Sequence, residues 1–255
     1  MRASSKASAL ARELRRHLRD AFEDDIAFVP LNSGEPLARG GSGVAQTALT
    51  GSREDVFQKL AETIRACRAC PLGRARRNAV PGEGSLAADV VFVGEGPGLD
   101  EDRLGRPFVG RAGQLLDRIL ASIGLSRDTV YIANMVKCHP MKDPDSPDSR
   151  GNDRPPSPDE MEACRGYIEA QLRLIAPRFI VTLGGVASKA LLREETPISK
   201  LRGRWREFSL EGLAAPIRLL PTYHPAALLR QPELKRAVWE DMKSLRDALG
   251  EPGRP

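Results

Sequence analysis

The chain has 255 residues, of which 41% are hydrophobic, and its formal net charge at pH 7 is +5. This length suits one substantial α/β domain with an extension, or two small domains. No apolar run approaches the ~18 residues that a membrane-spanning helix needs, and the N-terminus lacks the apolar segment of a secretory signal, which favours a cytoplasmic protein without a membrane span.

The first part of the chain differs in character from the rest. Leucines spaced by four predict a helix over Ala9–Phe22, and the Gly, Ser, Pro and Ala residues over 29–51 predict a flexible linker. Regular alternation of elements begins near Glu54 and continues to Leu249. We therefore divide the chain into an N-terminal helix and linker over 1–53, a main domain over 54–249 and a short tail over 250–255.

The main domain alternates short apolar runs with helical patterns. The runs that predict strands are Val90–Val93, Val130–Ala133, Phe179–Leu183 and Ile217–Pro221. The patterns that predict helices are Gln114–Ile123, Pro158–Ile175, Val186–Arg193 and Glu233–Leu249. Strands that alternate with helices form a parallel sheet with helices on both faces. The sequence thus predicts an α/β fold, a three-layer α/β/α sandwich around a four-stranded parallel sheet.

Polar residues follow three of the predicted strands. Glu95 comes after the first strand in a glycine-rich turn, Asn134 follows the second strand directly, and His224 comes shortly after the fourth. In open parallel sheets, ligands bind outside the carboxyl ends of the strands. A turn carboxylate, a turn amide and a helix-capping histidine each have a structural explanation, but their equivalent positions predict one shared site.

The chain has four cysteines. Cys67 and Cys70 form a C-x-x-C pair, whereas Cys138 and Cys164 stand alone. Buried free thiols are one explanation, since intracellular compartments disfavour disulfides. A metal site with four thiolates is the better explanation, and both zinc and an iron–sulfur cluster accept such ligands. Two lone cysteines in place of a second C-x-x-C pair favour the cluster, which would then join the N-terminal segment to the loop after Asn134.

Six stretches of the main domain together resemble one known family. They are CRACPLG (67–73), GEGPGLDED (94–102), GRPFVGRAGQLLD (105–117), NMVKC (134–138), KLRGRW (200–205) and PTYHPAALLR (221–230). In this order they resemble the family 4 uracil-DNA glycosylases, the iron–sulfur type, over roughly Glu54 to Leu249. The resemblance implies an α/β/α fold with a four-stranded parallel sheet, a [4Fe-4S] cluster, and monofunctional removal of uracil from DNA in base excision repair.

The resemblance also implies roles for single residues. Glu95 and Gly96 match the water-handling first motif and Glu101 matches its far end. Glu95 is therefore expected to be catalytic, and Gly96 and Glu101 are expected to help bind the substrate. His224 is the second catalytic residue and is expected to face O2 of the departing base. The expected ligands of the cluster are Cys67, Cys70, Cys138 and Cys164.

Expectations for base recognition come from the resemblance and from the hydrogen-bonding groups of uracil. The resemblance implies that Phe108 stacks on a uracil extruded from the duplex, and base–aromatic stacking contributes about 1–3 kcal/mol. The side-chain amide of Asn134 offers a donor and an acceptor. These groups match O4 and N3–H of uracil and mismatch cytosine.

A basic segment and the segment after His224 are the expected contacts with DNA. The positive net charge fits a polyanionic partner. The expected partner is uracil-containing DNA, either single- or double-stranded, and the protein is expected to bind it as a monomer. The expected contacts are Lys200, Arg202, Arg204, Leu228 and Arg230. The basic side chains would bind phosphates, which makes the affinity salt-dependent. Leu228 and Leu229 would enter the base stack as a wedge, and packing in a helix core is the alternative for these leucines.

Two other functions compete with this hypothesis. A non-catalytic iron–sulfur module that binds nucleic acids would share the fold but would lack Glu95, Asn134 or His224. An enzyme that binds a nucleotide phosphate in the glycine-rich turn is disfavoured, because Glu95 would repel the phosphate. The stretch between Cys138 and Cys164 is longer than the family pattern and predicts a surface loop insertion.

Overall fold

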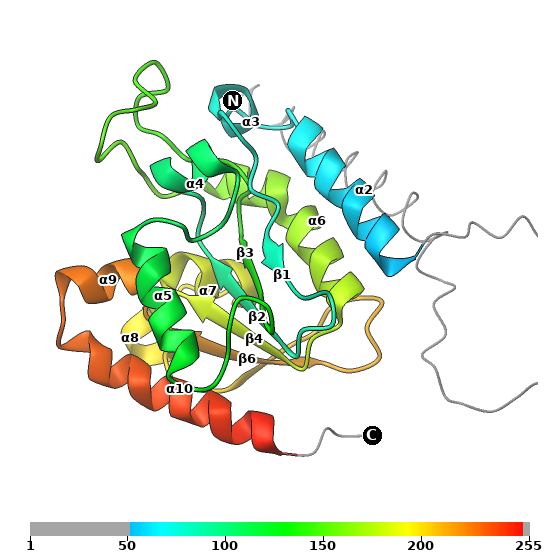
Figure 1. Cartoon of the computed structure of the whole chain (residues 1–255), viewed down its shortest axis with the longest axis vertical. Helices are drawn as coiled ribbons and strands as arrows, with labels where there is room; N and C mark the ends of the chain where they lie inside the picture. The colour runs from blue at the N-terminus through cyan, green and yellow to red at the C-terminus, as the bar shows by residue number, and fades with distance from the viewer. Residues whose placement is uncertain (1–51, 252–255) are drawn as a thin grey trace, which may run out of the picture.

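The computed structural model describes residues 52–251 of the chain (Figure 1). The helix predicted over 9–22 and the linker after it lie outside these residues, so the division into three parts stays a prediction. The described part begins with α2 (Arg53–Ala66), whose N-cap Ser52 forms a capping box with Asp55. None of the helices within residues 52–251 is both long and apolar enough to cross a membrane.

The centre of the fold is a mixed six-stranded sheet with the strand order β1-β3-β2-β4-β6-β5. Four central strands run parallel, as the sequence predicts: β2 (Val90–Gly94), β3 (Tyr131–Asn134), β4 (Phe179–Leu183) and β6 (Ile217–Thr222). Two edge strands, β1 (Glu83–Gly84) and β5 (Arg206–Phe208), run antiparallel to their neighbours. The sequence prediction lacked both edge strands because elements this short leave no detectable alternation pattern.

Four further helices agree with the predicted ones, whereas α2 was not predicted. They are α5 (Arg111–Ala121), α6 (Pro158–Ile175), α7 (Gly185–Leu192) and α10 (Leu234–Gly250). Shorter helices are α3 (Leu72–Ala75), α4 (Leu99–Leu104), α8 (Ile198–Leu201) and α9 (Pro225–Arg230). The start of α6 was predictable because Ser157 and Glu160 form a capping box. Helix α5 begins earlier than predicted because its N-cap is Gly110, which gives no side-chain capping signal.

Helices cover both faces of the sheet, which confirms the three-layer α/β/α sandwich (Figure 1). Successive residues of a strand point to opposite faces, so Phe92 packs against α5, α9 and α10, whereas Val91 packs against α6 and α7. Helix α2 lies outside this sandwich and packs against α6 through Leu60, Ile64 and Tyr167. The cysteine-bearing segment after α2 is thereby held near the start of α6.

Candidate active site

The carboxyl ends of β2 and β3 lie side by side, and this brings Asn134 to the glycine-rich turn. Gly94, the last residue of β2, pairs with Asn134, the last residue of β3. A Cβ atom at position 94 would lie 2.3 Å from Asn134 Oδ1 and 2.6 Å from Phe108 Cζ. Both distances are too short for non-bonded atoms, so a side chain at Gly94 would displace Asn134 and Phe108 from their positions.

Phe108 reaches the site on a loop that Glu101 supports. Its backbone has a φ of 52°, in the left-handed region that non-glycine residues rarely adopt. The Glu101 carboxylate accepts hydrogen bonds from the backbone N–H groups of Gly98 (3.1 Å), Val109 (2.8 Å) and Gly110 (3.0 Å). Because these bonds all go to the backbone, Glu101 serves the site by positioning the Phe108 loop. The direct substrate contact expected of Glu101 stays a prediction.

His224, which follows the end of β6, lies against Phe108. The two ring centroids are 5.5 Å apart and the ring planes differ by 31°. His224 is the N-cap of α9, and its Nδ1 accepts the N–H of Ala226 at 3.1 Å. Burial of the ring, together with the positive charge of Arg230, lowers the pKa of His224 to about 4. The ring is therefore neutral at pH 7, and because Nδ1 is an acceptor, the proton sits on Nε2.

The side chain of Asn134 is buried with an unused hydrogen-bond acceptor. Asn134 is 1% exposed, and its Oδ1 has no hydrogen-bond partner in the described part of the chain. A buried acceptor without a partner costs about 1–3 kcal/mol. The backbone of Asn134 is firmly held, since Lys137 Nζ donates to its carbonyl oxygen at 2.8 Å. A fixed amide with an open acceptor beside Phe108 is suited to binding a ligand.

Glu95 and Gly96 occupy the turn that follows β2. The carbonyl oxygen of Glu95 accepts the N–H of Val136 at 3.2 Å, so this turn runs along the segment after Asn134. Within residues 52–251, the Glu95 carboxylate has no hydrogen bond or ion pair, and burial raises its pKa above the ordinary value. A Cβ atom at Gly96 would lie 2.7 Å from Val136 Cγ2. Gly96 thus permits close packing of the turn, and its contact with substrate stays a prediction.

Three of the five expected DNA contacts are available at the surface, and Arg202 is not. Lys200, Arg204 and Arg230 are exposed, and they form no ion pair with another described residue. Arg202 instead donates to the buried carboxylate of Asp241, with Nε 3.0 Å from Oδ2. A buried carboxylate is strongly destabilised when its counter-charge is removed. We therefore correct the prediction for Arg202, which is engaged in holding α10 to the segment before β5.

The wedge predicted at Leu228 also needs correction. Leu228 is 2% exposed and packs in the core with α5 and α10. Its neighbour Leu229 is 38% exposed. Successive helical residues differ by roughly 100° in direction because a turn has about 3.6 residues. Core packing thus explains Leu228, and Leu229 is the leucine that faces outward.

The four cysteines converge beside the sandwich, between α2, α6 and the segment after β3. Cys138 and Cys164 are buried, and Cys67 and Cys70 are partly buried in the same apolar cluster. Cys67 caps the end of α2 and Cys164 lies in α6. Residues from three separate segments thus bring the four cysteines into one apolar cluster, the cysteine site, and their role as ligands stays a prediction.

The chemistry of this site fits an iron–sulfur cluster. Burial raises the pKa of Cys138 to about 11 and also raises that of Cys164, so both need a bound cation to ionise. Arg76 Nη1 lies 2.8 Å from Cys138 Sγ, and the backbone nitrogen of Lys137 lies 3.3 Å from Cys164 Sγ. Hydrogen bonds to sulfur are a feature of such clusters. Within residues 52–251, no group of three His, Cys, Asp or Glu residues is arranged to hold a single metal ion.

The stretch before α6 forms a surface loop, as predicted. Its central residues 143–151 are mostly exposed. Asp148 forms ion pairs with Arg77 and with Arg103, which fastens this loop to α4 and to the chain after α3. At the end of this stretch, Arg154 pairs with Glu160 in the first turn of α6, so the loop is held at both α4 and α6.

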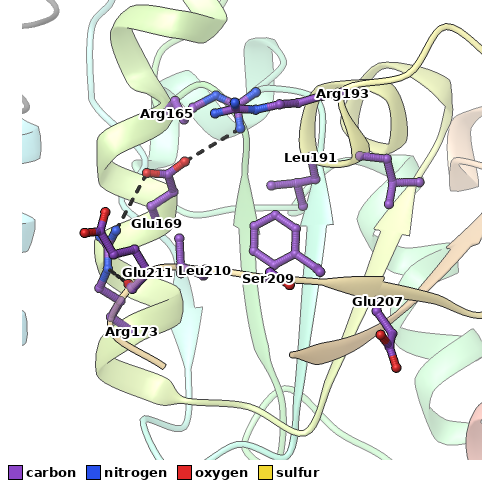
Figure 2. A pocket seen from close by; sticks show the side chains of 11 residues that line it. Arg165, Glu169, Arg173, Leu191, Arg193, Glu207, Ser209, Leu210 and Glu211 are labelled. Atoms are coloured by element: carbon purple, nitrogen blue, oxygen red, sulfur yellow. Dashed lines mark hydrogen bonds and ion pairs between the residues drawn. The ribbon is translucent and has the colours of Figure 1, made fainter. Parts of the chain in front are cut away.

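A cavity of about 530 Å³ lies elsewhere, between α6, the end of α7 and the edge strand β5 (Figure 2). Figure 2 shows that Arg165, Glu169 and Arg173 of α6 line one side of it, with Glu169 between the two arginines. None of the predicted site residues lines this cavity. The convergence of Phe108 and His224 therefore defines a different site, at the carboxyl ends of the strands.

Sequence reasoning assigned no role to two residues that lie at these sites, Gly94 and Lys137. Gly94 leaves room for two site side chains, and its place at the last strand position was the only signal. Lys137 is buried between Asn134 and the cysteines, and a lysine directly before Cys138 was a visible signal.

Comparisons with known proteins agree with this arrangement. Residues 81–243 match the uracil DNA glycosylase superfamily. The chain is 41% identical over 208 residues to the type-4 uracil-DNA glycosylase of Sulfurisphaera tokodaii, covering 78% of this chain and 88% of that protein. It is 40% identical over 200 residues to that of Saccharolobus solfataricus (76% and 87% covered) and 40% identical over 205 residues to that of Thermotoga maritima (79% and 99% covered). The chain therefore belongs to the type-4 uracil-DNA glycosylases of the uracil DNA glycosylase superfamily.

Proposed function

We propose that this uracil-DNA glycosylase holds an extruded uracil among Phe108, Asn134 and His224 and hydrolyses its N-glycosidic bond, leaving an abasic site. A base inside a duplex is out of reach of side chains, so the nucleotide must first leave the stack. The observation that carries the proposal is the buried Asn134 Oδ1 without a partner, beside the paired rings of Phe108 and His224. The uracil-DNA glycosylase relatives support the same activity.

Asn134 is the proposed reader of the base. Its Oδ1 would accept the N3–H of uracil, and its Nδ2 would donate to O4. Cytosine has an amino group in place of O4 and no hydrogen at N3, so it would leave both amide groups mismatched. Each buried mismatch costs about 1–3 kcal/mol. Phe108 would stack on the base and hold its edge against the amide.

His224 and Glu95 are the proposed catalytic residues. The oxygen of a water molecule bonds to C1′ while the electron pair of the C1′–N1 bond leaves with uracil, through an oxocarbenium-like state. The Nε2–H of neutral His224 would donate to O2 of uracil as negative charge grows there. The carboxylate of Glu95 would position the water and take its proton. No step of this scheme requires the cysteine site.

Glu95 predicts how the rate depends on pH. Only the carboxylate can accept a proton, and burial raises its pKa, so kcat/KM should fall on the acid side at a pH above the ordinary pKa of a glutamate. His224, with a pKa of about 4, should add no change near neutral pH. The measurement is kcat/KM for a uracil-containing oligonucleotide across pH. The Glu95→Gln variant should have a kcat/KM about 10²–10⁴-fold lower, without the decrease at acid pH. The same acid-side decrease in this variant would show that Glu95 does not cause it.

We assign the binding of DNA to exposed residues of α9 and of the basic segment after α7. Lys200, Arg204 and Arg230 would contact phosphates. Leu229 alone would fill the space that the extruded nucleotide leaves, a role first expected of Leu228 and Leu229 together. We expect a monomer that accepts both single- and double-stranded DNA.

The four cysteines are proposed to hold a [4Fe-4S] cluster. When bound, it would supply a covalent link between the segment after α2, the segment after β3 and α6. Cys138 lies four residues after Asn134, so this link would fix the chain next to the base-reading amide. The buried thiols, the hydrogen bonds to sulfur and the type-4 relatives support this cofactor.

One experiment tests the function directly. The protein is incubated with oligonucleotides that contain one uracil, single- or double-stranded, and the products are treated with alkali. We expect strand breaks at the uracil, and none in the matched oligonucleotide with thymine at that position. Intact uracil-containing DNA that the protein still binds would instead support the non-catalytic nucleic-acid-binding module.

A further inference from the structure

Lys137 is a buried lysine between the base-reading residue and the cysteine site. It is 1% exposed, and its backbone N–H lies 3.3 Å from Cys164 Sγ. Its Nζ donates to the carbonyl oxygen of Asn134 at 2.8 Å and to Oε1 of Gln171 at 2.7 Å. The side chain of Lys137 thus contacts the last residue of β3, and the backbone of Lys137 contacts a proposed cluster ligand.

The ammonium group of Lys137 lacks an ordinary counter-charge. Both of its acceptors are neutral, and it forms no ion pair with a carboxylate of the described residues. The backbone nitrogen of Lys137 lies 3.3 Å from Cys164 Sγ, and the next residue in the chain is Cys138, so two proposed cluster ligands flank this lysine. An isolated buried charge is expensive unless it is paired. A cluster with four thiolate ligands carries net negative charge and would supply the missing partner.

Gln171, the second acceptor for the Lys137 ammonium, is itself held by two hydrogen bonds. Gln171 donates its amide to the carbonyl oxygen of Pro81 at 2.7 Å and to the hydroxyl of Tyr131 at 3.2 Å. These partners lie in the chain before β1 and at the start of β3. The Lys137 ammonium is therefore held in place, and through it the carbonyl of Asn134 at the end of β3 is fixed.

We propose that Lys137 is a positioning residue that couples the cluster to uracil recognition: its ammonium is the buried counter-charge of the cluster and fixes the backbone of Asn134. This inference rests on the proposed cluster and deepens its role. The cluster then does more than join three segments, because its charge stabilises the lysine that aims the recognition amide. Loss of the cluster leaves that lysine uncompensated and loosens Asn134.

The test compares Lys137→Met with Lys142→Met in the cluster-containing protein. Lys142 also donates to a backbone carbonyl, that of Gly151 at 2.8 Å, but it is exposed and its side chain does not bind Asn134. Removing the positive charge at Lys137 should shift the reduction potential of the cluster to more negative values, measured by protein-film voltammetry. It should also lower kcat/KM for uracil release by about tenfold or more, with unchanged affinity for uracil-free DNA. Lys142→Met should change neither quantity.

Further measurements distinguish a failure of the proposed cluster from a failure of the proposed coupling. Iron content and visible absorbance of the unaltered protein come first, because a protein without iron refutes the cluster and this coupling but leaves uracil excision standing. An unchanged potential and an unchanged kcat/KM in an iron-loaded Lys137→Met variant would overturn the coupling alone. If Lys137→Met does not fold, Gln171→Glu places a carboxylate against the ammonium. The potential should then also become more negative, and an unchanged potential would overturn the proposal.

Discussion

Replacing His224 with asparagine is expected to lower kcat for uracil release by about 10²–10³-fold while the protein keeps its stability. The Oδ1 of asparagine can replace Nδ1 as the acceptor for the N–H of Ala226, and asparagine is a favoured N-cap residue. Its amide is too short to reach the position of the imidazole Nε2. The variant therefore removes the donor proposed for uracil O2 and preserves the cap of α9.

The matched variant is His224→Gln, which should keep the donor to uracil O2 and lose the acceptor that caps α9. The longer amide can place a donor near the position of Nε2 but loses the acceptor at Nδ1, so part of kcat should remain while stability falls by about 0.5–2 kcal/mol. Single-turnover excision and thermal unfolding measure the two effects separately. Full activity of His224→Asn would show that the role of His224 is to cap α9.

The sequence predicted those parts of the fold whose signals are local. Helix α6 was placed correctly because Ser157, Pro158 and Glu160 define its start within a few residues. The central strands were found because both faces of a covered parallel sheet are apolar, as in Val90–Gly94. The edge strand β5 was missed because its three residues are largely exposed and polar, and only pairing with β6 makes them a strand.

The candidate site was predictable at the level of strand ends, but the direction of single side chains was not. Asn134 and Phe108 come together because Gly94 between them has no side chain, a contact that joins distant segments. Arg202 and Arg204 look equivalent in the sequence, yet buried Asp241 engages only Arg202. Such choices depend on tertiary partners, which no periodicity records.

The protonation of His224 shows what the structure adds to the chemistry. The sequence left open whether this residue acts as imidazole or imidazolium. Its Nδ1 accepts a backbone N–H, and burial lowers its pKa to about 4, so the neutral form with the proton on Nε2 is fixed by the fold. A neutral donor avoids placing a permanent cation beside a developing oxocarbenium ion. The electrostatic help for that cation is then left to Glu95.

Asn134→Leu is expected to abolish uracil selection without a loss of stability. Leucine has nearly the shape of asparagine, and Asn134 Oδ1 has no protein partner among the described residues, so no hydrogen bond of that oxygen within the fold is lost. Removing an unpaired buried acceptor should leave the free energy of unfolding unchanged or raise it by about 1–3 kcal/mol. Excision should fall by about 10²-fold or more, since two hydrogen bonds to the base disappear.

Asn134→Asp separates recognition from shape in the same position. An ionised carboxylate only accepts hydrogen bonds, so it would bind N3–H of uracil but repel O4. Excision should weaken and DNA binding should persist, and the preference for uracil over cytosine should narrow because the cytosine amino group can donate to a carboxylate. The measurements are kcat/KM for both bases, affinity for uncleaved DNA, and thermal unfolding. Unchanged uracil excision in both variants would remove Asn134 from recognition, and a loss of stability in Asn134→Leu would show that its amide is structural. A residue that weakens the fold while it serves the reaction is expected only where a ligand completes its hydrogen bonds.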